Sequence, residues 1–130
     1  MRVARRVLPK LAPIMLVAAC TTSVGATPVQ SAPLPDGDYT FAHRFAEHPT
    51  MLSITMHVRV RGQRVAVTND DGPTDVFERG VVDEGLLLWH AASRQWIIGD
   101  TEADKDAPEV GGCSGGPEVI DLAKKIYWTC

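Results

Sequence analysis

Residues 53–68 read SITMHVRVRGQRVAVT, and this stretch decides the fold. Along 53–61 every second side chain is apolar, a period of two that predicts a β-strand with one buried and one solvated face. Gly62 comes next, and glycine at the first central position suits a two-residue type II′ turn. Pairing Arg61 with Arg64 then brings four apolar side chains onto one face: Val58, Val60, Val65 and Val67. The stretch therefore predicts a β-hairpin.

The same period appears on both sides of this hairpin. Asp38–Phe45 places three aromatic side chains and His43 on one face, which predicts a strand with an aromatic inner surface. Residues 86–91 and 95–100 predict a second hairpin, buried on both faces. Its register sets two aromatic side chains opposite each other: Trp89 and Trp96.

Three other segments are less regular. Residues 76–82 predict a strand interrupted near Gly80, and residues 83–85 predict a turn. In 117–127 the apolar residues follow the spacing i, i+3, i+4, i+7, which favours a short helix; a hairpin turning at residues 123–124 is the alternative.

Short strands separated by turn signals predict one mainly β domain over residues 36–130. We expect an antiparallel meander or a barrel-like sheet, with a short C-terminal helix and one disulfide. Gly37 and Tyr39 at its start are similar to the opening of small lipocalin-like barrels.

The first 20 residues have the form of a secretory leader. Four basic side chains open it: Arg2, Arg5, Arg6 and Lys10. The apolar run that follows, 11–19, is far shorter than the about 20 residues that span a bilayer. Val17–Cys20 reads VAAC and resembles the lipobox of bacterial lipoproteins. The resemblance implies a diacylglycerol on Cys20 and cleavage before it, which makes 1–19 the signal peptide. An ordinary signal peptide with an incidental cysteine is the alternative.

The residues after Cys20 bear on where the protein is held. In lipoproteins an aspartate directly after the lipidated cysteine often signals retention in the inner membrane, so Thr21 favours the outer membrane, facing the periplasm. Residues 20–35 are small, polar or proline and carry no charge, which predicts a flexible tether. Two or more acyl chains would anchor this tether stably.

The chain has three cysteines, an odd number. With Cys20 lipidated, Cys113 and Cys130 remain, and in an oxidising compartment we expect them to pair. This bridge would close a loop of residues 113–130 and fix the last residue of the chain.

Removal of the leader changes the charge balance. The precursor has a net charge of -3, but without the four leader cations 9 Lys and Arg face 16 Asp and Glu, a net charge of -7. This charge argues against a nucleic-acid partner and is compatible with a basic protein partner.

Residues 111–117, GGCSGGP, are close to the GDSGGP around the nucleophilic serine of chymotrypsin-like proteases. Cys113 stands where that family has aspartate, and one domain of this size cannot contain two barrels. A nucleophilic serine also needs an oriented base, and His90 lies on a predicted strand rather than in a cleft. We therefore assign no catalytic role to Ser114 and expect a glycine-rich loop around a disulfide.

No other residue pattern predicts a catalytic site, a metal site or a cofactor. The histidines lack paired metal-ligand spacing, and the acidic stretch 100–106 lacks the glycine and glutamate of a calcium loop. Three residues are candidates for ligand contact: Trp89, Trp96 and His43. The tryptophans could line a barrel mouth or belong to the core, and His43 could be a hydrogen-bonded core residue.

We expect a non-enzymatic binding or interaction module of the cell envelope, in which an acidic face binds a basic protein. Membrane-bound lysozyme inhibitors share this plan of a small lipid-anchored barrel, so a protein inhibitor fits. A carrier of a small apolar ligand is the alternative. An envelope hydrolase has least support, since no nucleophile, base and orienting group are evident.

Overall fold

The computed structural model describes residues 12–13 and 31–130, so Cys20, the lipobox and residues 20–30 of the predicted tether lie outside the described residues. Seven strands form one closed barrel in sequence order. Their bounds are β1 Gly37–Phe45, β2 Thr55–Arg61, β3 Arg64–Asn69, β4 Gly80–His90, β5 Gln95–Gly99, β6 Glu118–Asp121 and β7 Ile126–Thr129. A single turn of 3-10 helix, η1, spans Glu102–Asp106. The predicted mainly β, barrel-like fold is confirmed.

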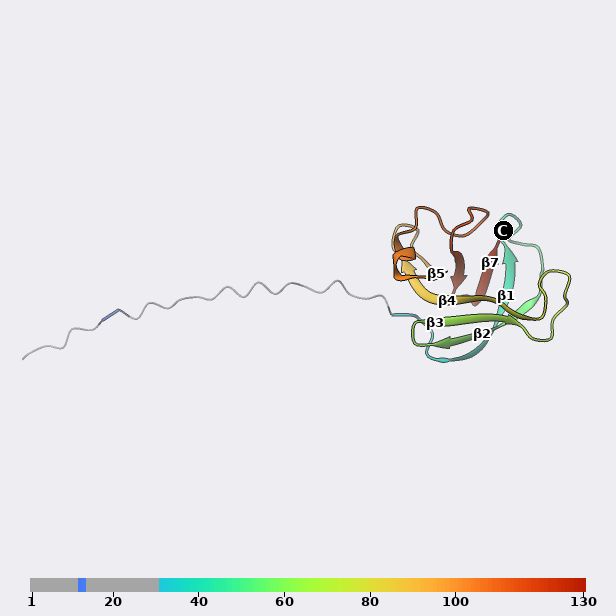
Figure 1. Ribbon diagram of the computed structural model, residues 1–130, viewed down its shortest axis with the longest axis horizontal. Coiled ribbons are helices and arrows are strands. Elements are labelled where there is room, and N and C mark those ends of the chain that lie inside the picture. Colours follow the sequence, from blue (N-terminus) through green and yellow to red (C-terminus); the bar gives the residue numbers. More distant parts are fainter. Residues whose placement is uncertain (1–11, 14–30) are drawn as a thin grey trace, which may run out of the picture.

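The barrel closes through β1 and β7. Consecutive strands pair antiparallel, whereas β1 and β7 pair parallel, from Ala42–Ile126 to Phe45–Thr129. An up-and-down meander with an odd number of strands must close in this way, because its first and last strands run in the same direction. Figure 1 shows the arrowheads of β1 and β7 pointing to the same end of the barrel. Closure leaves neither strand as an open edge.

The predicted register of the first hairpin is confirmed, with Arg61 opposite Arg64 and the valines of β2 and β3 facing each other. Gly62 has a φ of 57°, which the first central residue of a type II′ turn requires. The second hairpin, β4–β5, is also confirmed, with Trp89 opposite Trp96.

Apolar side chains fill the interior of the barrel. Those buried in the main cluster are Phe41, Met56, Val58, Val60, Val65, Val67, Leu87, Ile98, Ile120, Leu122 and Tyr127. A smaller cluster lies on the other face of the β4–β5 hairpin and contains Leu88, Ile97 and Val119, with Trp128 packed against it. The hairpin is therefore buried on both faces, as predicted. Because side chains occupy the centre of the barrel, a ligand would have to bind at one of its ends.

The turn predicted at residues 83–85 is wrong, and the strand predicted at 76–82 begins only at Gly80. β4 is continuous; its first part pairs with β3 and its last part with β5. Gly85 lies where the pairing changes, and a Cβ atom there would clash with the carbonyl oxygen of Gly99. Glycine at this position permits close approach of two backbones rather than a turn.

The helix favoured for residues 117–127 is also wrong; the alternative, a hairpin, is what forms, with β6 and β7 joined by residues 122–125. Val119 and Ile120 are both buried because β6 is covered on both faces. Extended strands here supply hydrogen-bond partners to β5 and β1, whereas a helix of this length is marginal and would leave the barrel open.

The residues before β1 take part in the packing. Ala32 and Leu34 lie against the main cluster, and the Tyr39 hydroxyl donates a 2.6 Å hydrogen bond to the carbonyl of Pro35. Packing therefore begins before Asp36. In the part of the chain that the structure describes, no helix is long and apolar enough to cross a membrane.

Candidate functional site

The loops of the barrel fall into two sets because successive strands alternate in direction. Loops 46–54, 70–79 and 100–117 lie at one end, here called the acidic end. They contain ten acidic residues, Glu47, Asp70, Asp71, Asp75, Glu78, Asp100, Glu102, Asp104, Asp106 and Glu109, and two basic ones, Arg79 and Lys105.

The opposite end, here called the tryptophan end, is made by the entering segment 31–36 and the turns 62–63, 91–94 and 122–125. It contains one acidic residue, Asp36, and three basic ones, Arg94, Lys124 and Lys125. The acidic charges of the domain are thus concentrated away from the end at which the N-terminal segment enters.

Two carboxylates face the interior at the acidic end. Glu118 on β6 is paired with inward-facing Ile98, and Asp83 on β4 has the same parity as inward-facing Leu87. They line a pocket of about 500 Å³ together with Phe77, Glu78, Val81, Val82, Tyr127, Thr129 and Cys130. We call it the carboxylate pocket.

The short length of β5 brings these carboxylates together. β5 ends at Gly99, which pairs with Leu86, so the part of β4 before Leu86 has no β5 residue beside it. Asp83 therefore approaches the first residue of β6 instead. The Tyr127 hydroxyl donates a 3.1 Å hydrogen bond to Asp83 Oδ2.

Burial makes this pair hard to ionise. It raises the pKa of Asp83, and burial followed by the nearby Asp83 charge raises the pKa of Glu118 to about 7. The pKa of Tyr127 is raised by burial and by the same carboxylate. Among the described side chains, none donates a hydrogen bond to Glu118 Oε2, which is a buried atom.

The carboxylate pair is reached from a second side. A pocket of about 430 Å³ also contains Asp83 and Glu118, and its other walls include Asp100, Asp104 and Pro117. Solvent, or a small group, can therefore approach the pair both over β4 and β7 and beneath the 100–117 loop.

His43 lies inside the same half of the barrel. It is fully buried, and its Nδ1 and Nε2 contact Ser53 Oγ at 2.6 Å and Thr129 Oγ1 at 2.9 Å. The rings of Phe45 and Phe77 pack edge-on against it. Burial, and secondarily Arg44, lowers its pKa, so the ring is neutral at pH 7.

The three tryptophans line one pocket of about 270 Å³ at the tryptophan end. It forms because β5 and β6 pair at only two positions and then diverge. Trp89 and Trp96 are half-buried, with ring centroids 5.5 Å apart at 61°, and Pro33 of the entering segment is part of the wall. The structure thus brings Trp89 and Trp96 together but places His43 elsewhere.

The predicted disulfide between Cys113 and Cys130 is confirmed, with Cα atoms 4.6 Å apart. Ser114 lies in the bridged loop, where its hydroxyl donates a 2.7 Å hydrogen bond to the carbonyl of Gly111. His90 shares a pocket with Ser114, but its Nε2 bonds the Ala107 carbonyl and its Nδ1 contacts Ser93 Oγ, both at 2.7 Å. Neither ring nitrogen is directed at Ser114 as a base would be.

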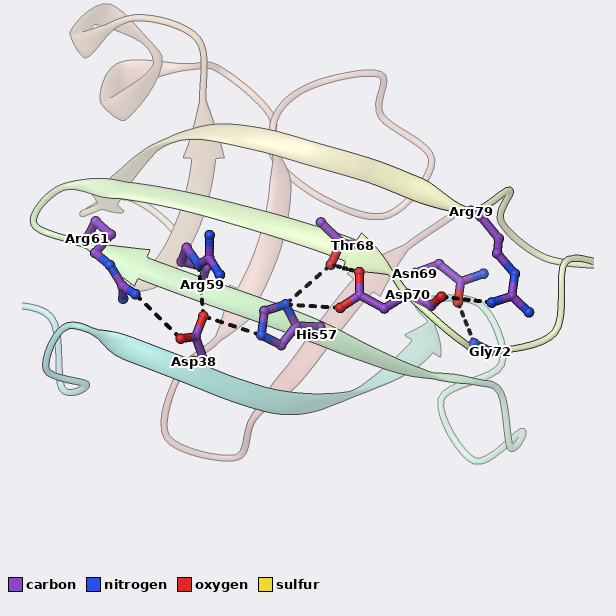
Figure 2. Close-up of polar contacts among 9 residues, drawn as sticks. All are labelled: Asp38, His57, Arg59, Arg61, Thr68, Asn69, Asp70, Gly72 and Arg79. Atoms are coloured by element: carbon purple, nitrogen blue, oxygen red, sulfur yellow. Dashed lines mark hydrogen bonds and ion pairs between the residues drawn. The ribbon is translucent and has the colours of Figure 1, made fainter.

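A polar network covers the outer face of β1, β2 and β3, as Figure 2 shows. His57 lies between two carboxylates, with Nε2 3.3 Å from Asp38 and Nδ1 3.4 Å from Asp70. Asp38 also accepts a 2.8 Å hydrogen bond from Arg59, and this bond, aided by the charge of Arg59, holds the pKa of Asp38 below its usual range. The network is exposed and lines none of the pockets above, so we assign it to the surface of the sheet.

The acidic stretch 100–106 forms η1 and its cap. Asp104 Oδ2 accepts hydrogen bonds from the backbone amides of Asp100 and Thr101, at 2.6 and 3.1 Å. In residues 12–13 and 31–130, no group of three or more His, Cys, Asp or Glu side chains is placed to hold a metal ion.

Comparison of the chain with protein-family models, with curated proteins and with solved structures found no match. The carboxylate pocket was not predicted from the sequence. The sequence pattern predicts a turn at Asp83 and favours a helix that contains Glu118. A strand over residues 118–121 would have placed Glu118 on the same face as Ile120, because alternate residues of a strand share a face.

Proposed function

We propose that this chain is a lipid-anchored binding protein of the cell envelope whose acidic end binds a cationic protein. The observation that carries this proposal is the segregation of charge, with ten acidic against two basic residues in the three loops of that end. Such a surface attracts basic partners and disfavours acidic ones.

The position of the anchor supports the same function. The VAAC motif resembles a lipobox, and lipidation of Cys20 would attach the protein through residues 20–35. The described part of this segment, residues 31–35, lies at the tryptophan end, where Pro33 lines the tryptophan pocket. The acidic end is therefore opposite the attachment point. If the protein is anchored in the outer membrane and faces the periplasm, this end is accessible to a periplasmic partner.

A non-enzymatic role fits the contacts of the candidate catalytic residues. The Ser114 hydroxyl is used inside its own loop, and both ring nitrogens of His90 have other partners. Inhibition of a cationic enzyme is the form of binding that we propose, on the same plan as membrane-bound lysozyme inhibitors.

The test measures binding to lysozyme, as a cationic envelope-active enzyme, by calorimetry. The protein is the chain from residue 20 with Cys20→Ser, since all seven strands and the disulfide lie within residues 31–130. We expect binding at about 10 mM salt that weakens at about 150 mM, where the screening length falls from about 30 to about 8 Å. Lack of binding at the lower salt concentration would remove lysozyme and similarly charged enzymes as partners.

Two variants with equal charge change locate the surface. Asp71→Asn with Asp75→Asn removes two exposed charges at the acidic end and should weaken binding. Asp36→Asn with Asp38→Asn removes two charges from the start of β1 and should leave it nearly unchanged. Equal effects of the two pairs would show that only net charge matters. Mass spectrometry of the native N-terminus tests the anchor separately.

A second candidate function is binding of a small ligand in the tryptophan pocket, because Trp89, Trp96 and Trp128 all line it. A bound aromatic or apolar ligand would change tryptophan fluorescence, and Trp89→Ala should reduce that change. We propose this site in place of a central cavity for an apolar ligand, because side chains fill the centre of the barrel.

A further inference from the structure

We infer that the carboxylate pocket binds one organic cation, a primary ammonium or a guanidinium group, between Asp83 and Glu118. This inference rests on the proposed function, in which the group is the end of a lysine or arginine side chain of the partner. It assigns the recognition chemistry to one pocket, whereas the proposed function requires only an acidic surface.

The first argument is the unpartnered acceptor. Glu118 Oε2 is buried and receives no hydrogen bond from the described residues, while the neighbouring Asp83 receives one from Tyr127. Buried acceptors without donors are rare and unfavourable, and a carboxylate is the strongest acceptor that a side chain offers. Because Oε2 is buried, a donor from outside the chain would satisfy it after the Glu118 side chain turns toward the carboxylate pocket, and a charged donor would do so most strongly.

The second argument is the shape of the pocket. Its volume of about 500 Å³ exceeds that of one water-sized group, and its walls combine the two carboxylates with Phe77, Val81 and Val82. Val81 is 60% exposed although it is apolar. Lysine and arginine have apolar stems and charged ends, so the stem would contact this wall while the end reaches the carboxylates.

The third argument is the charge of everything that faces Glu118. Asp83 comes from β4, Tyr127 from β7 and Glu78 from the 70–79 loop. Asp100 and Asp104 come from the 100–117 loop on the second side. Within residues 12–13 and 31–130, no basic side chain lines either pocket, so an entering cation meets no competitor there.

A metal ion fits less well than an organic cation. Calcium takes six to eight oxygen ligands, and no group of three or more ligating side chains exists among residues 12–13 and 31–130. An ammonium or guanidinium group needs only two or three acceptors directed at its N–H groups.

Binding of a cation is coupled to the protonation of Glu118. With the pocket empty, burial raises the pKa of Glu118 to about 7, so a large fraction of the carboxyl groups carries a proton near neutral pH. A cation beside the carboxylate stabilises the charged form and lowers this pKa. Affinity should therefore rise as pH increases from about 6 to about 8, since the cation binds the deprotonated form.

The experiment titrates Nα-acetyl-lysine amide and Nα-acetyl-arginine amide into the chain from residue 20 with Cys20→Ser. Nα-acetyl-norleucine amide is the uncharged control. NMR of the glutamate side-chain carbons follows Glu118. We expect the two cations, and not the control, to lower the pKa of Glu118. We also expect Glu118→Gln to weaken their binding about tenfold, the size expected for loss of one charged hydrogen bond. Asp36→Asn, an exposed residue at the tryptophan end, should have little effect.

Each outcome is decisive. No change in the Glu118 pKa with either cation overturns the inference, whatever the variant does, because this measurement uses the unsubstituted pocket. Equal binding by Glu118→Gln also overturns it. If lysozyme still binds through the loops in those cases, the proposed function stands without the pocket. If the cations bind at Glu118 but no basic protein does, the pocket stands and the proposed function falls.

Discussion

The two ends of the barrel are built differently. The tryptophan end has tight connections, of which two contain four residues and one contains two, and non-glycine residues Arg94 and Lys125 adopt left-handed φ angles there. The acidic end has loops of 9 to 18 residues, most of the acidic charge and the disulfide. The tight turns set the register of the barrel, whereas long surface loops generally tolerate sequence change and can hold a binding surface.

The largest expected effect is at the acidic end. Cys113→Ser with Cys130→Ser should lower the free energy of unfolding by about 3 kcal/mol, because the bridge closes an 18-residue loop in the unfolded chain. Urea denaturation measures this difference. An unchanged urea midpoint would show that packing alone stabilises the acidic end. The disulfide would then no longer distinguish the acidic end from the tryptophan end.

The tryptophan end should respond to loss of packing. Trp96→Ala should lower the free energy of unfolding by about 2 kcal/mol, less than for a fully buried tryptophan, because Trp96 is half-buried against the main cluster. Trp89→Ala is the matched control and should have a smaller effect, since Trp89 lies outside that cluster. Urea denaturation measures both variants. A larger loss of stability for Trp89→Ala than for Trp96→Ala would mean that the packing of the tryptophan end depends on Trp89 instead.

The carboxylate pocket should oppose stability at high pH. The folded-state pKa of Glu118, about 7, lies above its ordinary 4.5, so the stability of the native protein falls as pH rises through that window. Glu118→Gln should raise the free energy of unfolding by about 1 kcal/mol at pH 8. This is less than the free energy that corresponds to the whole pKa shift, because the side chain is partly solvated. It should change nothing at pH 4. A variant less stable than the native protein at pH 8 would contradict this sign.

The smallest effect concerns the tight turns. Arg94 has a φ of 58°, a conformation that a side chain makes unfavourable. Arg94→Gly should raise the free energy of unfolding by about 0.5 kcal/mol, after allowance for the flexibility of glycine in the unfolded chain. Arg94→Ala keeps the strain and serves as the control. Thermal unfolding that ranks alanine above glycine would show that this turn is not strained.

The sequence was informative wherever one local pattern determined the structure. Alternating residues and a Gly-containing turn predicted β2–β3, and opposed tryptophans predicted β4–β5, both with the observed register. The pairing of Cys113 with Cys130 was predicted from the cysteine count.

The predictions were wrong where pairing with segments distant in the sequence determines the secondary structure. Residues 83–85 resemble a turn, but their pairing with β3 holds them within one strand. Residues 117–127 fit a helical spacing, but closure of the barrel requires two strands. The carboxylate pocket depended on both errors, because Asp83 and Glu118 meet only when these segments are extended. The local pattern predicted the end of β5 to within one residue. It did not predict that β4 continues past that end, which is what brings the two carboxylates together.

The central claim is that partners bind at the acidic end, and amide NMR tests it most directly. The chain labelled with nitrogen-15 is titrated with lysozyme at low salt, and the shift of each backbone amide is followed. The account predicts that the largest changes occur in loops 70–79 and 100–117 and that the turns 91–94 and 122–125 are almost unaffected. The largest changes in the two turns, with unaffected loops, would contradict it.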